Sequence, residues 1–368
     1  CQEAWASACQ QYCQRDAVGI IANRGTAVGP VSNRPYKTRW LRAVLCVFYA
    51  AFCLASARSS AATTAASPEA DWTVGCVDCP RSFDALTDRS LRLLPDGRPA
   101  VAYGGDHLYF AWHDGVSWQF QTVDDAPAVG ASAALALAAD GEPAIAYYDA
   151  FQHDLKYARR SADGWRQQVV DAAGDAGATA ALALDAAGRP HIAYYRHAGD
   201  GTAAMLAYAR WADAAWQLSK VTDTASTVRY ISLALGSDDR PQISFYDAAT
   251  EDLRYARWTG ATWELQTVDS NGNVGEGCSL ALDAADLPHL SYYAYDGVRG
   301  ALRYATWDGV TGHPWTSHVA DDTADVGGYT SIALDSAGRP VISYRDFTHG
   351  DLKLARWTDA GPTHRAAG

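Results

Sequence analysis

One line of sequence recurs six times along the chain and constrains the fold more than any other feature. Each copy has a small-Leu-Ala-Leu segment, a polar turn, a proline, and an alternating segment that ends in or next to aromatic residues. Apolar and polar residues that alternate on both sides of a turn predict antiparallel strands. The copies are 44 to 52 residues apart, measured between the turn prolines Pro99, Pro143, Pro190, Pro241, Pro288 and Pro340.

Each copy contains four segments with the character of short strands. The first is Leu-Ala-Leu, the second ends near the aromatic residues, the third resembles residues 253–258, and the fourth follows the pattern Trp-x4-Val-Asp. Four antiparallel strands in a unit of ~45 residues are typical of a β-propeller blade, and no copy has the 3.6-residue period of a helix. We therefore predict an all-β fold, a six-bladed β-propeller of four-stranded antiparallel blades, over residues 72–359.

The two ends of the repeat region predict how the propeller closes. The sixth copy ends after its third strand, at residues 352–357, and a Trp-x4-Val-Asp pattern occurs instead at residues 72–78. We expect this N-terminal strand to complete the last blade, because closure of the ring removes exposed sheet edges. Residues 360–368 are then a tail.

The segment before the repeats has the features of an export signal. Residues 1–35, which begin with Cys, are interpreted as an upstream or non-native segment. A basic stretch with Lys37, Arg39 and Arg42 precedes an apolar run and an Ala-Ser-Ala cleavage pattern, which predicts a signal peptide over residues 36–57. An Ala/Ser/Thr-rich linker follows at residues 58–71. We expect a secreted, periplasmic or cell-surface protein; an uncleaved anchor helix is the alternative, although the apolar run is shorter than the ~20 residues of a bilayer span.

Net charge and cysteine spacing limit the classes of partner and metal that the protein is expected to bind. The formal net charge of −12 argues against a nucleic-acid partner, because phosphate binding needs a concentrated basic surface. We also expect no membrane partner once the signal is cleaved. Cys76 and Cys79 form a Cys-x-x-Cys pair without a second such pair or a histidine pair, which disfavours zinc and favours a local disulfide in an exported protein.

The line S-L-A-L-D-x-x-G-x-P-x-I-x-Y-Y-D and the strand L-x-Y-A-x-W resemble exported bacterial β-propeller proteins of the sialidase-like superfamily. The sialidase Asp-box, S-x-D-x-G-x-x-W, is absent in its strict form, and so is the Arg-Ile-Pro motif. The resemblance implies the fold, whereas such propellers include lectins, glycosidases, lyases and scaffolds. We predict a non-catalytic propeller that binds carbohydrate or another extracellular polymer; the alternatives are a sialidase-like glycosidase or polysaccharide lyase, and a scaffold for protein partners.

Residues that depart from their column of the repeat are candidate ligand-binding residues, because blade packing does not explain them. Arg92 stands where the other copies have alanine, Arg196 where most have aspartate or a small residue, and Arg345 where most have tyrosine. We expect these arginines at the channel mouth, where they would favour an acidic sugar, with internal salt bridging as the alternative. The other expected members of this site are Arg229, Tyr148, Tyr195, Tyr246, Asp149, Asp247 and Asp346.

Two further clusters are open to a functional interpretation. Glu276 with Tyr230 or Tyr329 is the best pair for a glycosidase-like acid and nucleophile. We otherwise expect neither a catalytic residue nor a cofactor. Calcium is the alternative, because the residues Asp269, Asn271 and Asn273 place oxygen ligands at alternate positions.

The signal-peptide interpretation predicts where the mature chain begins. Because the Ala-Ser-Ala pattern ends at residue 57, N-terminal sequencing of the exported protein should begin near Arg58, or near Ala62 if the second small-residue pattern is used. Recovery of the uncleaved chain from the membrane fraction would contradict cleavage and support the anchor helix.

Overall fold

The computed structural model describes residues 77, 89–197, 204–222, 227–358 and 361–366. The expected signal peptide, the linker, and the pair Cys76 and Cys79 lie outside the described residues. All described strands belong to one compact unit, Val74–Gly368. Within this part of the chain, there is no apolar helix of the length that a bilayer crossing requires.

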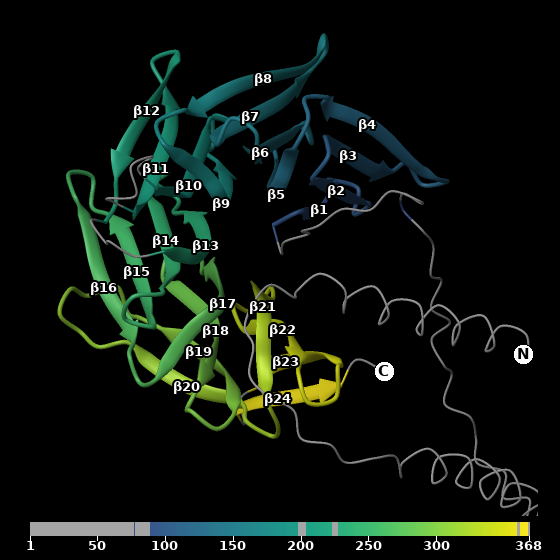
Figure 1. Ribbon diagram of the computed structural model, residues 1–368. Helices are drawn as coiled ribbons and strands as arrows, with labels where there is room; N and C mark the ends of the chain where they lie inside the picture. Colours follow the sequence, from purple (N-terminus) through teal and green to yellow (C-terminus); the bar gives the residue numbers. More distant parts are fainter. Residues whose placement is uncertain (1–76, 78–88, 198–203, 223–226, 359–360, 367–368) are drawn as a thin grey trace, which may run out of the picture. The chain divides into compact units, whose positions relative to one another are not determined.

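The described residues form six antiparallel sheets of four strands each, and the strands of every sheet follow one another in chain order (Figure 1). The first three sheets are sheet one, β1 (Leu91–Leu93), β2 (Pro99–Gly104), β3 (Leu108–His113) and β4 (Trp118–Asp124); sheet two, β5 (Val129–Leu137), β6 (Pro143–Asp149), β7 (Asp154–Ser161) and β8 (Gly164–Asp171); and sheet three, β9 (Asp175–Leu184), β10 (Pro190–His197), β11 (Ala204–Ala212) and β12 (Ala215–Lys220).

The second half of the chain repeats this plan. Its sheets are sheet four, β13 (Val228–Leu235), β14 (Pro241–Asp247), β15 (Asp252–Trp258) and β16 (Trp263–Asp269); sheet five, β17 (Asn273–Leu282), β18 (Pro288–Tyr295), β19 (Gly300–Thr306) and β20 (Thr316–Asp321); and sheet six, β21 (Val326–Leu334), β22 (Pro340–Asp346), β23 (Leu352–Thr358) and β24 (Gly361–Ala366). The predicted all-β architecture of six four-stranded sheets is confirmed.

The turn prolines mark the start of the second strand in every sheet. Proline cannot donate a ladder hydrogen bond, so the first residue of a strand is one of the few places where a sheet tolerates it. The preceding turn is fixed by aspartate: Asp185, for example, accepts hydrogen bonds from the backbone N–H groups of Ala187 and Arg189 at 3.0 and 2.7 Å. The Asp-x-x-Gly-x-Pro segments at residues 185–190 and 335–340 therefore encode a tight reversal between the first two strands of their sheets.

The hydrophobic core lies between successive sheets. In the boundary between sheets one and two, Leu108 and Phe110 of β3 pack against Leu135 and Tyr147 of sheet two. The same leucine position is fully buried in the first five sheets, at Leu108, Leu155, Leu206, Leu253 and Leu302. Each sheet thus buries its apolar side chains against the next one, which gives a β-propeller-like stack.

The expected closure by an N-terminal strand is wrong, because β24 occupies the fourth position of sheet six and pairs with β23 from Lys353↔Ala366 to Thr358↔Gly361. The expected tail therefore contributes a strand. Within residues 72–78 only Val77 is described, and it packs against Tyr103 and Tyr109 of sheet one. In the described part of the chain no strand of sheet one pairs with sheet six, and Leu352 is 64% exposed where its five counterparts are at 0%.

A buried aspartate joins most sheets to the next. It ends the fourth strand of one sheet and accepts a hydrogen bond from a tyrosine hydroxyl on the second strand of the following sheet. The four bonds, with O–O distances of 2.6 to 2.8 Å, run from Tyr147 to Asp124, Tyr194 to Asp171, Tyr292 to Asp269 and Tyr344 to Asp321.

A cation contacts each of these carboxylates as well. The distances to the nearest Oδ2 are 2.5 Å for Lys156 on Asp124, 3.5 Å for Arg196 on Asp171, 3.3 Å for Arg303 on Asp269 and 2.5 Å for Lys353 on Asp321. Burial raises the pKa of the Asp321 carboxyl, but the hydrogen bonds from Lys353 and Tyr344 outweigh burial and lower that pKa overall. The carboxylate therefore stays ionised in the folded protein.

Replacement of this carboxylate should destabilise the fold. Asp321→Asn removes the charge that faces Lys353, whose side chain is only 9% exposed, and should lower the free energy of unfolding by about 3 kcal/mol at pH 7. Tyr344→Phe, which removes a neutral donor, should cost about 1 kcal/mol. Urea unfolding of both variants and the parent measures these differences.

The same variant predicts a pH dependence. Because the folded-state pKa of Asp321 is lowered, its contribution is fully present above the unfolded value of about 4 and is lost as the pH falls toward the lower folded value. The parent should therefore lose more stability than Asp321→Asn between pH 5 and pH 2. Equal acid sensitivity of the two proteins would contradict this role.

Candidate ligand-binding site

The three aspartates expected at the channel mouth are buried and shape turns. Asp149 accepts hydrogen bonds from the N–H groups of Phe151 and Gln152, at 3.1 and 2.9 Å. Asp247 and Asp346 accept the corresponding bonds in sheets four and six. These bonds form the turn between the second and third strands, so turn formation accounts for the recurrence of aspartate at this position.

The structure does not bring the three departing arginines together. Arg196 donates to the carbonyl oxygen of Ala173 at 3.0 Å and contacts Asp171, and Arg345 lies over the ring of Phe347 at 5.2 Å. Both are at the end of a sheet where the second strand turns into the third. Arg92 pairs in register with Ala100, beside the turn at the opposite end, and donates to the carbonyl oxygen of Leu91. A ligand-binding role for these arginines stays a prediction.

The tyrosines of the same strand ends also join sheets. The Tyr148 hydroxyl donates to Asp175 of sheet three at 2.8 Å, and the equivalent Tyr293 donates to Asp325 of sheet six at 2.8 Å. Tyr195 packs into the core between sheets three and four, and Tyr246 is buried with its ring 6.3 Å from that of Tyr230. Contacts between sheets explain the recurrence for Tyr148, Tyr195 and Tyr293, whereas the ring contact of Tyr246 is with Tyr230 of its own sheet.

The members of the expected acid–tyrosine pair lie on the first strands of sheets four, five and six, at Tyr230, Glu276 and Tyr329. Arg229 pairs in register with Tyr246, and Glu276 pairs with Tyr293. Burial, then the charge of Glu276 and the proximity of Tyr329, raise the pKa of Tyr230. A raised pKa keeps the hydroxyl protonated, which is the opposite of what a tyrosine nucleophile needs.

Asp269, the first ligand of the alternative calcium site, already takes part in other contacts. The Asp269 carboxylate already accepts hydrogen bonds from Tyr292 and Arg303, and from the backbone N–H of Asn271. Asn273 is the first residue of β17. Within the described ranges, no group of three or more His, Cys, Asp or Glu side chains is arranged to hold a metal ion.

Three grooves lie between successive sheets, at the end where the first strand turns into the second. We name them by their sheets: the two-three groove has a volume of about 260 Å³, and the three-four and four-five grooves have volumes of about 480 Å³ each. Each one is lined by at least one tryptophan and at least two arginines. Aromatic walls with a few charged donors are the usual composition of a small-molecule site.

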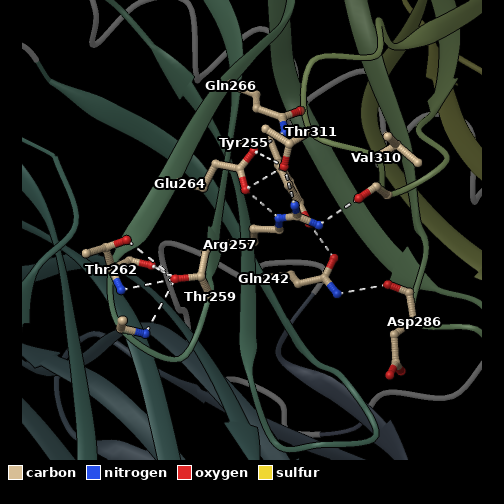
Figure 2. A network of polar contacts seen from close by, with 12 residues as sticks. Gln242, Tyr255, Arg257, Thr259, Thr262, Glu264, Gln266, Asp286, Val310 and Thr311 are labelled. Carbon is tan, nitrogen blue, oxygen red and sulfur yellow. Dashed lines mark hydrogen bonds and ion pairs between the residues drawn. The ribbon is translucent and has the colours of Figure 1, made fainter.

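The four-five groove shows how the repeat builds such a site (Figure 2). Arg257 of β15 donates from Nε to Glu264 at 2.8 Å, and from its terminal nitrogens to Gly309 and Thr311 of sheet five at 3.1 and 2.9 Å. Its guanidinium also lies 4.4 Å from the ring centre of Trp307. Arg257 is therefore held in place between the two sheets, and a carboxylate balances its charge.

A second contact between sheets lies on the fourth strands. The indole Nε1 of a tryptophan donates to a glutamine of the preceding sheet, at 2.8 to 2.9 Å, in the pairs Trp165 to Gln121, Trp216 to Gln168 and Trp315 to Gln266. Between sheets three and four, the glutamine position holds Ser219, which pairs in register with Tyr208 as Gln168 pairs with Tyr157. The Nε1 of Trp263 is buried there, and no described residue forms a hydrogen bond with it.

Sequence reasoning did not find these grooves, although a signal exists. The fourth strands read Trp-x-x-Gln in sheets one, two and four, and Trp-Gln-Leu-Ser in sheet three. Ser219 lies on a fourth strand, whereas the columns that predicted the site lie on the first two strands of each copy.

Comparison with known proteins supports the fold. No protein-family model and no curated protein matches the chain. Two structures of an ulvan lyase from a new polysaccharide lyase family, one of them bound to -[GlcA(1-4)Rha3S]-, are similar with TM-scores of 0.53 and 0.52 at 13% and 14% identity, covering 76% of this chain and 82% of the lyase. An alpha-L-arabinanase of Penicillium chrysogenum, complexed with arabinobiose, has a TM-score of 0.49 at 11% identity, over 69% of this chain and 87% of the arabinanase. At these identities the likeness shows the fold alone.

Proposed function

We propose that this chain is an exported, non-catalytic carbohydrate-binding protein that holds sugar units in the grooves between its sheets. The observation that carries the proposal is a donor in each groove that nothing in the described residues satisfies: the Tyr157 hydroxyl in the two-three groove, Trp263 Nε1 in the three-four groove and Trp307 Nε1 in the four-five groove. A buried donor without a partner costs stability and marks a place for an acceptor.

The composition of the grooves suits a sugar. Tryptophan rings offer flat apolar faces for the C–H faces of a pyranose, and guanidinium groups donate to hydroxyl or carboxylate oxygens. Trp258 lines both the three-four and the four-five groove, so these two sites are neighbours on the surface. Repeated neighbouring sites favour a polymer, because a chain that fills two of them gains affinity from linkage.

Two alternatives are a glycosidase or polysaccharide lyase and a scaffold for protein partners. Glu276 beside Tyr230 favours a glycosidase or polysaccharide lyase, although the raised pKa of Tyr230 does not support it as a nucleophile. A scaffold for protein partners would use the same grooves. The ulvan lyase that shares the fold is bound to an acidic repeat, -[GlcA(1-4)Rha3S]-, which supports a choice of acidic polysaccharides as the first ligands to test.

The proposal predicts that loss of one shared tryptophan weakens binding. Trp258→Ala should lower the affinity for a bound polysaccharide by about tenfold or more, because it removes a wall of two grooves. Phe151→Ala, an exposed aromatic next to the turn at the opposite end of sheet two, should leave affinity unchanged. Affinity electrophoresis against a panel of neutral and acidic polysaccharides measures both.

Three outcomes would contradict this function. Failure of the parent to bind any polysaccharide would remove it, and equal loss in Phe151→Ala would place the ligand elsewhere. If the parent releases shortened or unsaturated products and Glu276→Gln does not, the protein is a glycosidase or lyase instead.

A further inference from the structure

One difference between the three-four groove and the neighbouring grooves is a missing contact. At the two flanking boundaries a glutamine side chain accepts a hydrogen bond from the indole N–H of Trp216 or Trp315. Ser219 is too short to repeat this, because serine lacks the extended amide of glutamine. Trp263 therefore keeps a buried donor in the wall of a groove of about 480 Å³.

The charge balance of this groove also differs. Arg210 of β11 occupies the strand position of Arg257 and pairs in register with Gln217, where Arg257 pairs with Glu264. Its Nε and one terminal nitrogen donate to the neutral Gln217 amide oxygen at 3.1 and 3.0 Å. The Arg210 guanidinium is thus held in place by an amide, whereas a carboxylate balances Arg257 at 2.8 Å.

The other two arginines that line the groove each contact a carboxylate. Arg189 contacts Asp185 at 2.6 Å, and Arg240 contacts Asp238 at 3.1 Å. A third carboxyl group, Asp239, also lines the groove and accepts a hydrogen bond from the backbone N–H of Ala186 at 3.1 Å. Arg210 is therefore the cation of the groove whose bonded partner carries no charge.

We propose that the three-four groove is the subsite for an acidic sugar unit, a uronate or a sulfate ester, whose oxygens accept hydrogen bonds from Trp263 Nε1 and the Arg210 guanidinium. Trp211 and Trp258 line the same groove and flank the sugar ring. This assignment rests on the proposed carbohydrate function and adds the ligand's charge and place. The four-five groove, where Glu264 neutralises Arg257 and Asp238 contacts Arg240, takes a neutral unit.

Ser219→Gln is the direct test, because it restores the residue found at the other boundaries. The added amide should bond Trp263 and fill the groove, so the affinity for oligogalacturonate should fall about tenfold or more while the melting temperature holds or rises. Ser219→Ala is the matched control, since Ser219 is exposed, and it should bind as the parent does. Isothermal titration calorimetry with oligogalacturonate, a sulfated galactan oligosaccharide and a neutral galactan oligosaccharide separates uronate from sulfate.

A second variant keeps the test independent of how Ser219→Gln folds. Gln217→Glu gives Arg210 the carboxylate partner that Arg257 has, and should abolish the preference for the acidic over the neutral oligosaccharide. Unchanged acidic binding in both folded variants would overturn the subsite. If Trp258→Ala still weakens binding in that case, the carbohydrate function survives without it; if the parent binds none of the three probes, the function itself falls.

Discussion

The arrangement of the sheets depends on a carboxylate that is buried where one sheet meets the next. A buried carboxylate is tolerated only with donors around it, and here a tyrosine hydroxyl and a cation of the adjoining sheets supply them. The tie between Tyr344, Lys353 and Asp321 is one example. All these ties lie where the fourth strand ends, so they hold the sheets together at one end. The grooves lie at the other end, where the turn prolines are and where, among the described residues, other contacts join the sheets, such as those of Arg257 with Gly309 and Thr311.

The boundary between sheets three and four breaks this scheme in several places at once. Phe245 stands where the other sheets have the tyrosine, and Thr222 stands where they have the aspartate. Replacing both partners of a buried hydrogen bond together leaves neither donor nor acceptor unsatisfied, which costs far less than the loss of one. The Trp263 indole is different, because its partner changed to Ser219 while the donor remained. A donor kept without its internal acceptor is the feature that assigns this boundary to a ligand.

The sequence predicted much of the fold because the repeat is carried by residues with local roles. Every turn proline begins a second strand, and the Trp-x4-Val-Asp segments of residues 118–124 and 263–269 are strands β4 and β16. The last strand was missed because Gly361–Ala366 carries none of that pattern and is a strand through its pairing with β23. Its sequence alone gives no reason to prefer a strand over a tail.

The site was harder to predict, since a departure from a repeat column has two possible causes. Arg196 departs from its column, but it provides a cation for Asp171. Ala207 stands where other sheets have the cation that contacts this aspartate, so one departure compensates for the other. Ser219 departs without compensation, and only the structure shows this, because Ser219 and Trp263 of the next sheet line the same groove. Contacts between strands of different sheets join residues some 44 positions apart in the sequence. A comparison of equivalent positions in the six copies does not reveal them.

The most direct measurement of this account is the indole N–H spectrum of the protein's 13 tryptophans with and without oligogalacturonate. The indole signal of Trp263 should move on ligand addition and become slower to exchange with solvent, because its N–H gains an acceptor. The signals of Trp165 and Trp315, which already donate to glutamine, should stay in place. A ligand that binds without moving the Trp263 signal, or that moves the signals of Trp165 and Trp315 equally, would contradict the claim that this unpartnered donor defines the site.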